Sequence, residues 1–202
     1  MKYPARIAAA ALLVIGAVLL NGCAEEEPWN LRDVSGLMPE LEFELTRAED
    51  EQTVTEAAFD DKIKVMYFGF TSCPDECPMT LARLSQALGQ MDEEDAEQVR
   101  VLFVSVDPER DQPERLAKYV DSFGERFVGL RGGIPDLREL TKRYRSTFGH
   151  GKPDDSGFYD VSHSNATYIF DRDGEIQLLG REDDDIDGIA ADLERLVESD
   201  GW

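Results

Sequence analysis

The segment from Val99 to Val106 is almost continuously apolar, and it limits the folds open to this chain more than any other feature. Strands with such a pattern are buried on both faces, as in sheets that helices cover on both sides. Residues 62–70 contain a second apolar run and are expected to form the first central strand. With 202 residues, 42% of them hydrophobic, the chain can bury one such core. These observations indicate an α/β domain.

Segments with helical and strand periodicity alternate along the rest of the chain. Apolar residues recur at helical spacing in four expected helices, at 78–91, 113–123, 135–148 and 186–197. Further strands are expected at 42–45, on a sheet edge, and at 127–130, 166–170 and 175–179. The turn between the last two contains Asp173-Gly174, which is typical of a tight hairpin. Its acidic residues lack the spaced ligands of a calcium loop, so the hairpin is favoured.

The predicted elements follow the order of a thioredoxin-like fold. We therefore predict an α/β domain with a central mixed β-sheet flanked by helices and with an N-terminal edge strand or hairpin. No internal repeat or second domain is visible, so residues 39–202 are assigned to this single domain. In open α/β sheets, ligand sites lie beyond the carboxyl ends of the central strands. Cys73 and Asp107 are expected at that place.

Cys73 and Cys77 are two of the three cysteines, and they follow the first central strand directly. If a helix begins near Pro74, a favourable first position for proline, the two sulfurs share one helical face and their Cα atoms lie about 6 Å apart. That separation suits a disulfide, and reduced thiols there are placed to share a metal ion. A helix N-terminus also favours negative charge, which predicts easier thiolate formation. A structural disulfide, or two buried thiols, is the alternative.

The first residues are typical of a bacterial lipoprotein signal. Two basic residues precede a 14-residue apolar stretch, 7–20, which is shorter than the roughly 20 residues that cross a bilayer easily. Leu20-Asn21-Gly22-Cys23 then resembles a lipoprotein processing site, with Cys23 as the lipidated N-terminus. We therefore expect a signal peptide at 1–22 and a membrane tether at 23–38. An uncleaved membrane anchor and a cleaved secretory signal are the alternatives.

The charge of the chain excludes one class of partner. The formal net charge is −22, and an acidic protein repels the phosphate backbone, so nucleic acid is not an expected partner. The acidic clusters at 92–95 and 183–185 are interpreted as solvated surface. We expect a monomer.

The chain has two histidines, and their local sequences differ. His163 stands just before the expected strand at 166–170, whereas His150 lies in the hydrophilic stretch 149–153. A loop histidine is usually solvated, and His150 is interpreted in that way. Periodicity alone predicts the same for His163.

Three motifs together resemble the Sco/SenC family. They are Gly69-Phe70-Thr71-Ser72-Cys73-Pro74-Asp75-Glu76-Cys77-Pro78, then Ser105-Val106-Asp107-Pro108-Glu109-Arg110-Asp111, then Val161-Ser162-His163-Ser164 before a strand and a hairpin. The resemblance runs from about residue 37 to the C-terminus and includes the membrane-tethered N-terminus. It implies a thioredoxin-like fold that binds copper on the outer face of the bacterial inner membrane or in the mitochondrial intermembrane space. Ser162 departs from the pattern, because many relatives have an acidic residue there.

The resemblance also implies roles for individual residues. Cys73, Cys77 and His163 would be the copper ligands, and Asp107 would lie nearby, supporting the site or taking part in surface recognition. The donors agree with this, since two thiolates and an imidazole suit three-coordinate Cu(I), whereas structural zinc takes four ligands. Cu(II) would need a further oxygen ligand, and it oxidises thiols, which links metal binding to disulfide chemistry. A loop-borne His163 is expected to swing away and open the site for transfer.

The function implied by the resemblance is that of a copper chaperone for the binuclear copper centre of cytochrome c oxidase. Its expected partners are the copper-site subunit of the oxidase and other periplasmic copper carriers or thiol reductants. We expect the protein at the cell membrane, lipid-anchored through Cys23 and facing the periplasm or the cell exterior. The alternative is a periplasmic thiol-disulfide oxidoreductase, in which Cys73 and Cys77 cycle between dithiol and disulfide without need of His163. Peroxide reduction is a more remote alternative.

Overall fold

The computed structural model of the chain describes residues 27–199. Eight strands form one mixed sheet in the order β1-β10-β9-β4-β5-β6-β2-β3. β4 (Ile63–Gly69) and β5 (Val99–Ser105) lie at its centre and run parallel, with Tyr67 opposite Phe103. Every residue of β4 is buried, and six of the seven in β5 are. The two apolar runs therefore form the central strands, as predicted.

The other strands of this sheet are shorter than the central pair. They are β1 (Arg32–Asp33), β2 (Glu44–Arg47), β3 (Thr53–Thr55), β6 (Phe127–Arg131), β9 (Thr167–Phe170) and β10 (Ile176–Gly180). The helices are η1 (Glu56–Phe59, a 3-10 helix), α2 (Glu76–Leu88), α3 (Glu93–Ala96), α4 (Pro113–Asp121), α5 (Ile134–Arg143) and α6 (Ile186–Ser199). Gly174, with a φ of +84°, closes the turn between the antiparallel strands β9 and β10. The predicted Asp-Gly hairpin is confirmed.

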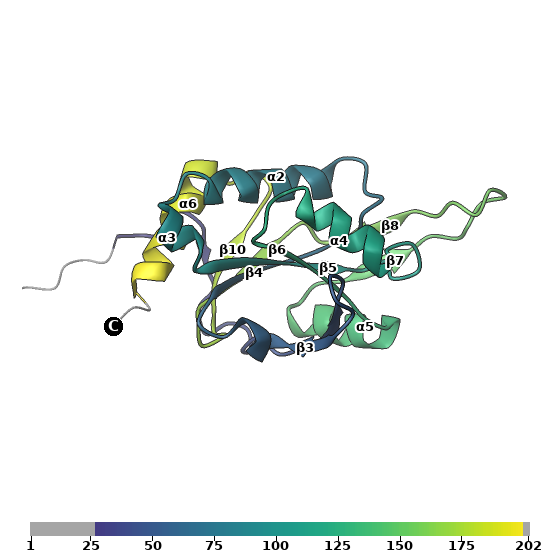
Figure 1. Cartoon of the computed structure of the whole chain (residues 1–202), viewed down its shortest axis with the longest axis horizontal. Coiled ribbons are helices and arrows are strands. Elements are labelled where there is room, and N and C mark those ends of the chain that lie inside the picture. The colour runs from purple at the N-terminus through teal and green to yellow at the C-terminus, as the bar shows by residue number, and fades with distance from the viewer. Residues whose placement is uncertain (1–26, 200–202) are drawn as a thin grey trace, which may run out of the picture.

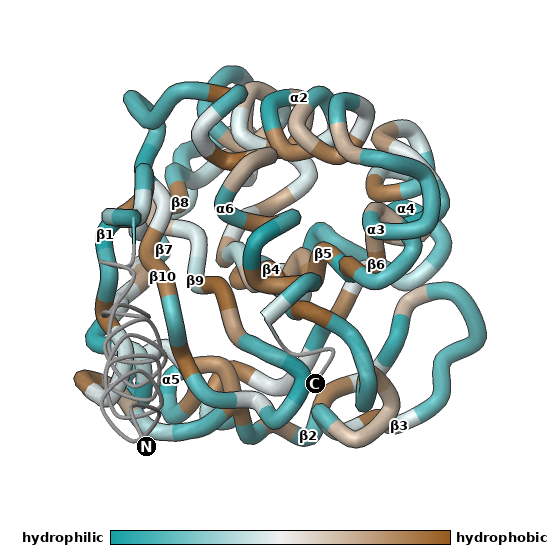
Figure 2. Tube along the Cα trace, turned by 90° about the vertical axis from the view of Figure 1, so that its left-hand side faces the viewer, coloured by the Kyte–Doolittle hydropathy of each residue, from teal (hydrophilic) through white to brown (hydrophobic). Residues whose placement is uncertain are grey.

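Helices cover both faces of the sheet. Figure 1 shows α2, α4 and α6 on one side and α5 on the other, and Figure 2 shows apolar segments along the central strands between them. One apolar cluster joins Leu81, Leu116 and Leu193, from the three helices of the first side, to the sheet. A second cluster joins Leu137 and Leu140 of α5 to the opposite face. This layered arrangement confirms the predicted thioredoxin-like class.

The predicted N-terminal edge strand or hairpin is a hairpin, and the predicted end of one helix is wrong. The strand expected on a sheet edge is β2, which pairs with both β3 and β6 and therefore lies one place inside the edge, as half of a hairpin with β3. The helix expected to reach Phe148 ends at Arg143. It stops there because Arg145 adopts a φ of +52° and Ser146 donates its N–H to the carbonyl of Thr141, at 2.8 Å.

A two-stranded ribbon that the sequence pattern does not predict lies outside the main sheet. β7 (Phe148–His150) pairs in antiparallel register with β8 (Val161–His163), so that Phe148 stands opposite His163. Residues 151–160 connect the two strands, and the ribbon projects from the body of the domain in Figure 1. His163 therefore belongs to a strand, whereas a loop position is expected from the sequence.

Part of the predicted tether packs against the domain. Leu31 is 4% exposed, and β1 pairs with β10 at the sheet edge. Asp192 of α6 accepts hydrogen bonds from the backbone N–H groups of Asn30, at 3.2 Å, and Leu31, at 2.7 Å. The guanidinium of Arg195 lies 3.8 Å from the ring centroid of Trp29. Residues from Trp29 onward thus pack against the domain, ten residues before the boundary predicted at residue 39.

The predicted signal peptide at 1–22 and the predicted lipidation site Cys23 lie outside the described residues. Within 27–199, no helix has the length and apolar character needed to cross a membrane.

Candidate metal centre

The two cysteines lie at the junction between β4 and α2. β4 ends at Gly69, a short turn follows, and α2 begins at Glu76. The predicted helix start near Pro74 is therefore two residues too early, and Cys73 precedes the helix that contains Cys77. The Sγ atom of Cys73 accepts a hydrogen bond from the backbone N–H of Cys77, at 3.4 Å. It thereby satisfies one of the N–H groups that a helix N-terminus leaves unpaired.

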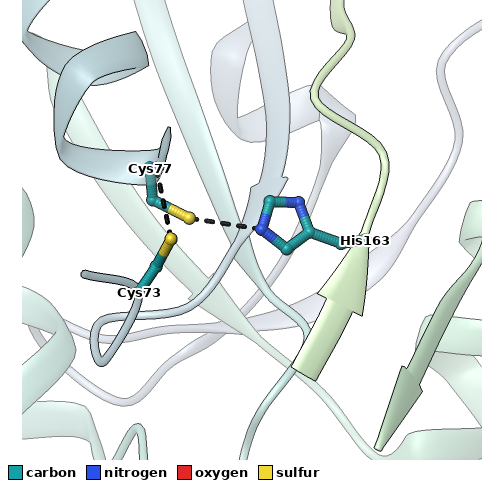
Figure 3. A group of neighbouring side chains, drawn as sticks. All are labelled: Cys73, Cys77 and His163. Carbon is teal, nitrogen blue, oxygen red and sulfur yellow. Dashed lines mark hydrogen bonds between the residues drawn. The ribbon is translucent and has the colours of Figure 1, made fainter. Parts of the chain in front are cut away.

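Three potential ligand atoms meet beside this junction, as Figure 3 shows. The Sγ atoms of Cys73 and Cys77 and a ring nitrogen of His163 all lie within 4.8 Å of one another. Nε2 of His163 is 3.4 Å from Sγ of Cys77, and both cysteines are free thiols. Within 27–199, this is the one group of three or more His, Cys, Asp or Glu side chains placed to hold a metal ion. The fold thus brings together the three residues that the sequence singles out.

His163 is oriented by its surroundings. Tyr67 and Phe70 contact the imidazole edge-on, with ring centroids 5.9 and 5.6 Å away. Nδ1 lies 3.0 Å from the carbonyl oxygen of Ser164. Because a carbonyl only accepts hydrogen bonds, Nδ1 carries the proton of the neutral ring, and the lone pair of Nε2 points toward Cys77. The ring is therefore held with its unprotonated nitrogen, the atom that can bind a metal, directed at the thiols.

The position of His163 on β8 changes the expected mode of opening. A loop-borne histidine can swing on its own, but β8 is paired to β7 along its whole length. Displacement of the imidazole by a backbone movement therefore requires the ribbon to move as a unit.

The two thiols differ in burial and in chemistry. Cys77 is 0% exposed, whereas Cys73 is partly exposed. Burial raises the pKa of Cys77 to about 12, because the thiolate would lose its hydration there. The prediction that the helix N-terminus eases thiolate formation is thus wrong for Cys77, since burial outweighs the helix end. Coordination of a cation would displace that proton.

Asp107 lies behind the ribbon and is 0% exposed. Its carboxylate accepts a hydrogen bond from the Tyr159 hydroxyl, at 2.6 Å, and forms an ion pair with Arg110. Arg110 also donates to the carbonyl oxygen of Tyr159, at 3.2 Å, and its guanidinium lies 4.0 Å from the Tyr159 ring centroid. A role in surface recognition would require an exposed carboxylate, and Asp107 is buried, so that expectation is wrong. Asp107 holds the chain segment that leads to His163.

His150 makes a second link between the ribbon and the end of β5. Its Nε2 lies 2.9 Å from the carbonyl oxygen of Val106, and its ring contacts Phe148 and Tyr159 edge-on. His150 is exposed, as expected, but it lies on β7 rather than in a loop, and its ring makes defined contacts. Its ring fastens β7 to the same segment that Asp107 fastens to Tyr159.

An open pocket of about 450 Å³ gives access to the centre. Cys73 and His163 line it together with Arg110 and Phe158, the last of which is 58% exposed. Its lining also includes the acidic residues Asp75, Glu76 and Asp160. A macromolecular or small-molecule partner can thus reach Cys73 without unfolding of the domain, while Cys77 lies behind it.

The residues that support the centre carry little sequence signal of their own. Tyr159 stands in a polar segment without periodicity, and nothing local predicts its contact with Asp107. Arg110 and Asp111 belong to the second motif of the family resemblance, and only that resemblance indicates a position near the centre.

The sequence model of the SCO1/SenC family matches residues 38–198. Among curated proteins, mitochondrial SCO2 of Saccharomyces cerevisiae is 32% identical over 90% of this chain and 54% of its own length. The sco1 protein of Schizosaccharomyces pombe is 34% identical over 72% of this chain and 55% of its own length. The chain thus spans about half the length of these curated relatives.

The fold of this chain is similar to those of several solved structures, and the similarity covers most of the described residues. ScoI of Bradyrhizobium japonicum with copper bound is 33% identical, with a TM-score of 0.69 over 78% of this chain and 98% of its own. The copper-bound ScoI of Arabidopsis thaliana is 30% identical, with a TM-score of 0.72 over 79% and 98%. Apo Sco1 of Thermus thermophilus is 31% identical, with a TM-score of 0.75 over 86% and 99%.

Proposed function

The chain belongs to the SCO1/SenC family, and from that premise we propose that it binds copper and delivers it to the binuclear copper centre of cytochrome c oxidase. The observation that carries this proposal is the convergence of Cys73, Cys77 and His163, whose donor atoms lie within 4.8 Å of one another. Two of the similar solved structures, at 30% and 33% identity, hold copper.

The donor chemistry supports copper as the cargo. Thiolate sulfur is a soft ligand that selects Cu(I), and imidazole also suits copper. Three protein donors complete a trigonal Cu(I) sphere, whereas structural zinc sites almost always have four. With Cu(II), the same donors leave room for an oxygen ligand from the open pocket.

The difference in burial between the thiols supports transfer rather than storage. Cys73 faces the pocket, so an incoming ligand of an acceptor can replace its sulfur first. Cys77 is 0% exposed and His163 is part of a ribbon, so these two donors are released later. Stepwise ligand exchange of this kind avoids free copper at any stage.

We place the protein at the cell membrane, anchored by a lipid on Cys23 and facing the periplasm or the cell exterior. The apolar stretch at 7–20 and the sequence before Cys23 support this location. The proposed partners are the copper-site subunit of the oxidase, other copper carriers and thiol reductants of that compartment. The acidic rim of the pocket favours partners that present basic residues around their own site.

A thiol-disulfide oxidoreductase is the second candidate, and one observation favours it. A partly exposed thiol at the pocket, backed by a buried thiol four residues on, suits attack on a disulfide followed by resolution of the mixed disulfide. This reaction does not use His163.

An anaerobic Cu(I) titration of the reduced chain against a competing chelator tests the leading proposal. We expect one tight site, loss of that site in the double variant Cys73→Ser/Cys77→Ser, and at least tenfold weaker binding in His163→Ala. Lys152→Ala is the matched control, because it changes an exposed side chain in the segment that connects β7 and β8. Its affinity is expected to stay within a few-fold of the unsubstituted chain.

Binding that is absent, or that does not respond to His163→Ala, contradicts the three-donor site. Retention of disulfide exchange in His163→Ala together with such a result would favour the oxidoreductase.

A further inference from the structure

Asp111 is a second buried carboxylate near the centre, after Asp107. It is not one of the three residues placed to bind the metal. Asp111 follows β5 and is 0% exposed. Its two oxygens accept three hydrogen bonds. Thr71 donates its backbone N–H at 2.9 Å and its hydroxyl at 2.6 Å, and Ser105 donates its hydroxyl at 2.6 Å.

These hydrogen bonds join two parts of the chain that are forty residues apart. Thr71 stands two residues before Cys73, in the turn between β4 and α2, and Ser105 is the last residue of β5. Asp111 is itself fixed, because its N–H donates to the carbonyl of Asp107 at 3.0 Å. The carboxylate therefore fastens the thiol-bearing turn to the end of the neighbouring central strand.

Arg115 holds the same turn from its outer side. Its Nε donates to the Thr71 hydroxyl at 2.7 Å, and its Nη2 donates to the Ser72 hydroxyl at 3.1 Å. The hydroxyl of Thr71 thus accepts from Arg115 while it donates to Asp111. The N–H and hydroxyl of Thr71 and the hydroxyl of Ser72 are thus all hydrogen-bonded, which limits the movement of the turn that bears Cys73.

We infer that Asp111 is a positioning residue for Cys73, and that the segment 105–111 supports both halves of the centre through two separate carboxylates. Asp107 fastens the ribbon that bears His163, through Tyr159. Asp111 fastens the turn that bears Cys73. The copper part of this inference rests on the proposed function, whereas the thiol part does not.

The physical effect of the fastening is to keep the two sulfurs close. Loss of the three hydrogen bonds allows the turn to sample positions in which Cys73 is remote from Cys77, and only the remaining fraction is competent to bind a metal. Groups that hydrogen-bond directly to metal ligands typically contribute 10–100-fold to metal affinity. We expect an effect of that order from Asp111, which acts on Cys73 through Thr71. When these hydrogen bonds are lost, Cys73 also spends less time close to Cys77, so the effective concentration of the Cys73 thiol near the Cys77 thiol falls.

The thiol equilibrium measures that effective concentration without any metal. Glutathione disulfide oxidises the pair. The Cys73–Cys77 S–S bond forms, the S–S bond of the reagent breaks, and two glutathione molecules leave, each taking one of the two thiol protons. A more distant pair of thiols shifts this equilibrium toward the dithiol.

The test uses the full chain with Cys23→Ser, so that the two thiols of the centre are the only ones. The thiol-disulfide equilibrium in a glutathione buffer and the Cu(I) affinity are measured for Asp111→Ala, Thr71→Val and Asp192→Ala. Asp192 is the matched control, because it is 2% exposed and also accepts three hydrogen bonds, but from Asn30 and Leu31.

We expect Asp111→Ala to shift the thiol equilibrium about tenfold toward the dithiol, or about 30 mV for a two-electron couple. Cu(I) affinity is expected to fall 10–100-fold. Thr71→Val should give a smaller change in the same direction. Asp192→Ala should leave both quantities within twofold, although it also weakens the fold.

Equal shifts in Asp111→Ala and Asp192→Ala would show that loss of stability alone acts on the thiols, and would overturn the inference. If Asp111→Ala does not fold, Thr71→Val decides, and an unchanged thiol equilibrium in that variant overturns it as well. Absence of Cu(I) binding in the unsubstituted chain contradicts the proposed function, and the thiol equilibrium still decides the role of Asp111.

Discussion

Nε2 of His163 lies 3.4 Å from Sγ of Cys77, although 86 residues separate them in the sequence. The sulfur is held by the buried face of α2, and the imidazole is held by a ribbon outside the main sheet. Neither element can form this contact alone. The centre is therefore a product of the completed fold, and changes that loosen either element are expected to alter it.

The pH dependence of stability should reveal the buried thiol. Burial raises the pKa of Cys77 from its ordinary 9.0 to about 12, so the folded chain holds this proton more tightly than the unfolded chain. The corresponding stability is fully present below pH 9 and is lost as the pH rises toward 12. For the reduced, metal-free protein, we expect the free energy of unfolding to fall by about 1 kcal/mol from this thiol between pH 9 and 10.

Urea unfolding at pH 9.0, 9.5 and 10.0 measures this loss, with Cys77→Ala as the comparison. Burial also raises the pKa of five tyrosines, which adds a loss of the same sign as the pH approaches 10; they are Tyr67, Tyr119, Tyr144, Tyr159 and Tyr168. These tyrosines are present in both proteins, so the difference between the unsubstituted chain and Cys77→Ala isolates the thiol. An identical pH dependence in Cys77→Ala and the unsubstituted chain would contradict the prediction.

Gly69→Ala should destabilise the fold and displace the Cys77 sulfur, because the added methyl group has no room between the sheet and the centre. A Cβ atom at this position would lie 2.7 Å from a ring carbon of Phe103 and 3.0 Å from the Cys77 sulfur. Overpacking of this kind costs about 1–3 kcal/mol, and we expect a lower urea midpoint together with weaker Cu(I) binding. Gly151→Ala is the control, because its nearest atoms are 3.4 Å away. Equal midpoints for the two variants would show that the sheet yields without cost.

Tyr159→Phe should loosen the ribbon without a change in shape. It removes the hydroxyl that donates to Asp107 and leaves a buried carboxylate one partner short, at a cost of about 1–3 kcal/mol. Hydrogen exchange followed by mass spectrometry should show faster exchange in β7 and β8 and little change in β4. Phe158→Ala, at a 58% exposed neighbour, should leave exchange unchanged. Uniform acceleration over all strands would point to global destabilisation instead.

Asp192→Ala should release the N-terminal segment. The carboxylate accepts the N–H groups of Asn30 and Leu31 at a position that is 2% exposed, and its loss costs about 1–3 kcal/mol. Limited proteolysis should then cleave between residues 27 and 34 sooner than in the unsubstituted chain. Asp187→Ala, an exposed carboxylate on the same helix, is the control. Unchanged cleavage times in Asp192→Ala would mean that β1 pairing alone holds the segment.

The parts of the fold that follow from the sequence are those with strong local patterns. The apolar runs of β4 and β5 and the periodic faces of α2, α4 and α6 predict these elements, because burial in this fold depends on the same residues. The β7–β8 ribbon was not predictable in this way. Its strands have three residues each and owe their position to His150 and Tyr159, whose partners lie about 50 residues earlier.

The same reasoning separates the predicted from the unpredicted parts of the centre. Cys73 and Cys77 stand out by spacing, and the family resemblance supplied His163. The high pKa of Cys77 did not follow, because a helix N-terminus and burial act in opposite directions and only the packed structure shows that burial is stronger. The docking of Leu31 was also hidden, since its partner Asp192 is 161 residues away.

The assembly of the centre from a ribbon and a helix end has a consequence for the lifetime of the protein. On the proposed function, a bound ion joins the ribbon to the start of α2 and the turn before it. Its binding free energy adds to the stability of the fold, by about 2.7 kcal/mol when the free ion is at 100 times Kd. Each delivery removes that contribution. The empty carrier then opens more often and is degraded first, so the abundance of the protein in the cell should follow the supply of its cargo.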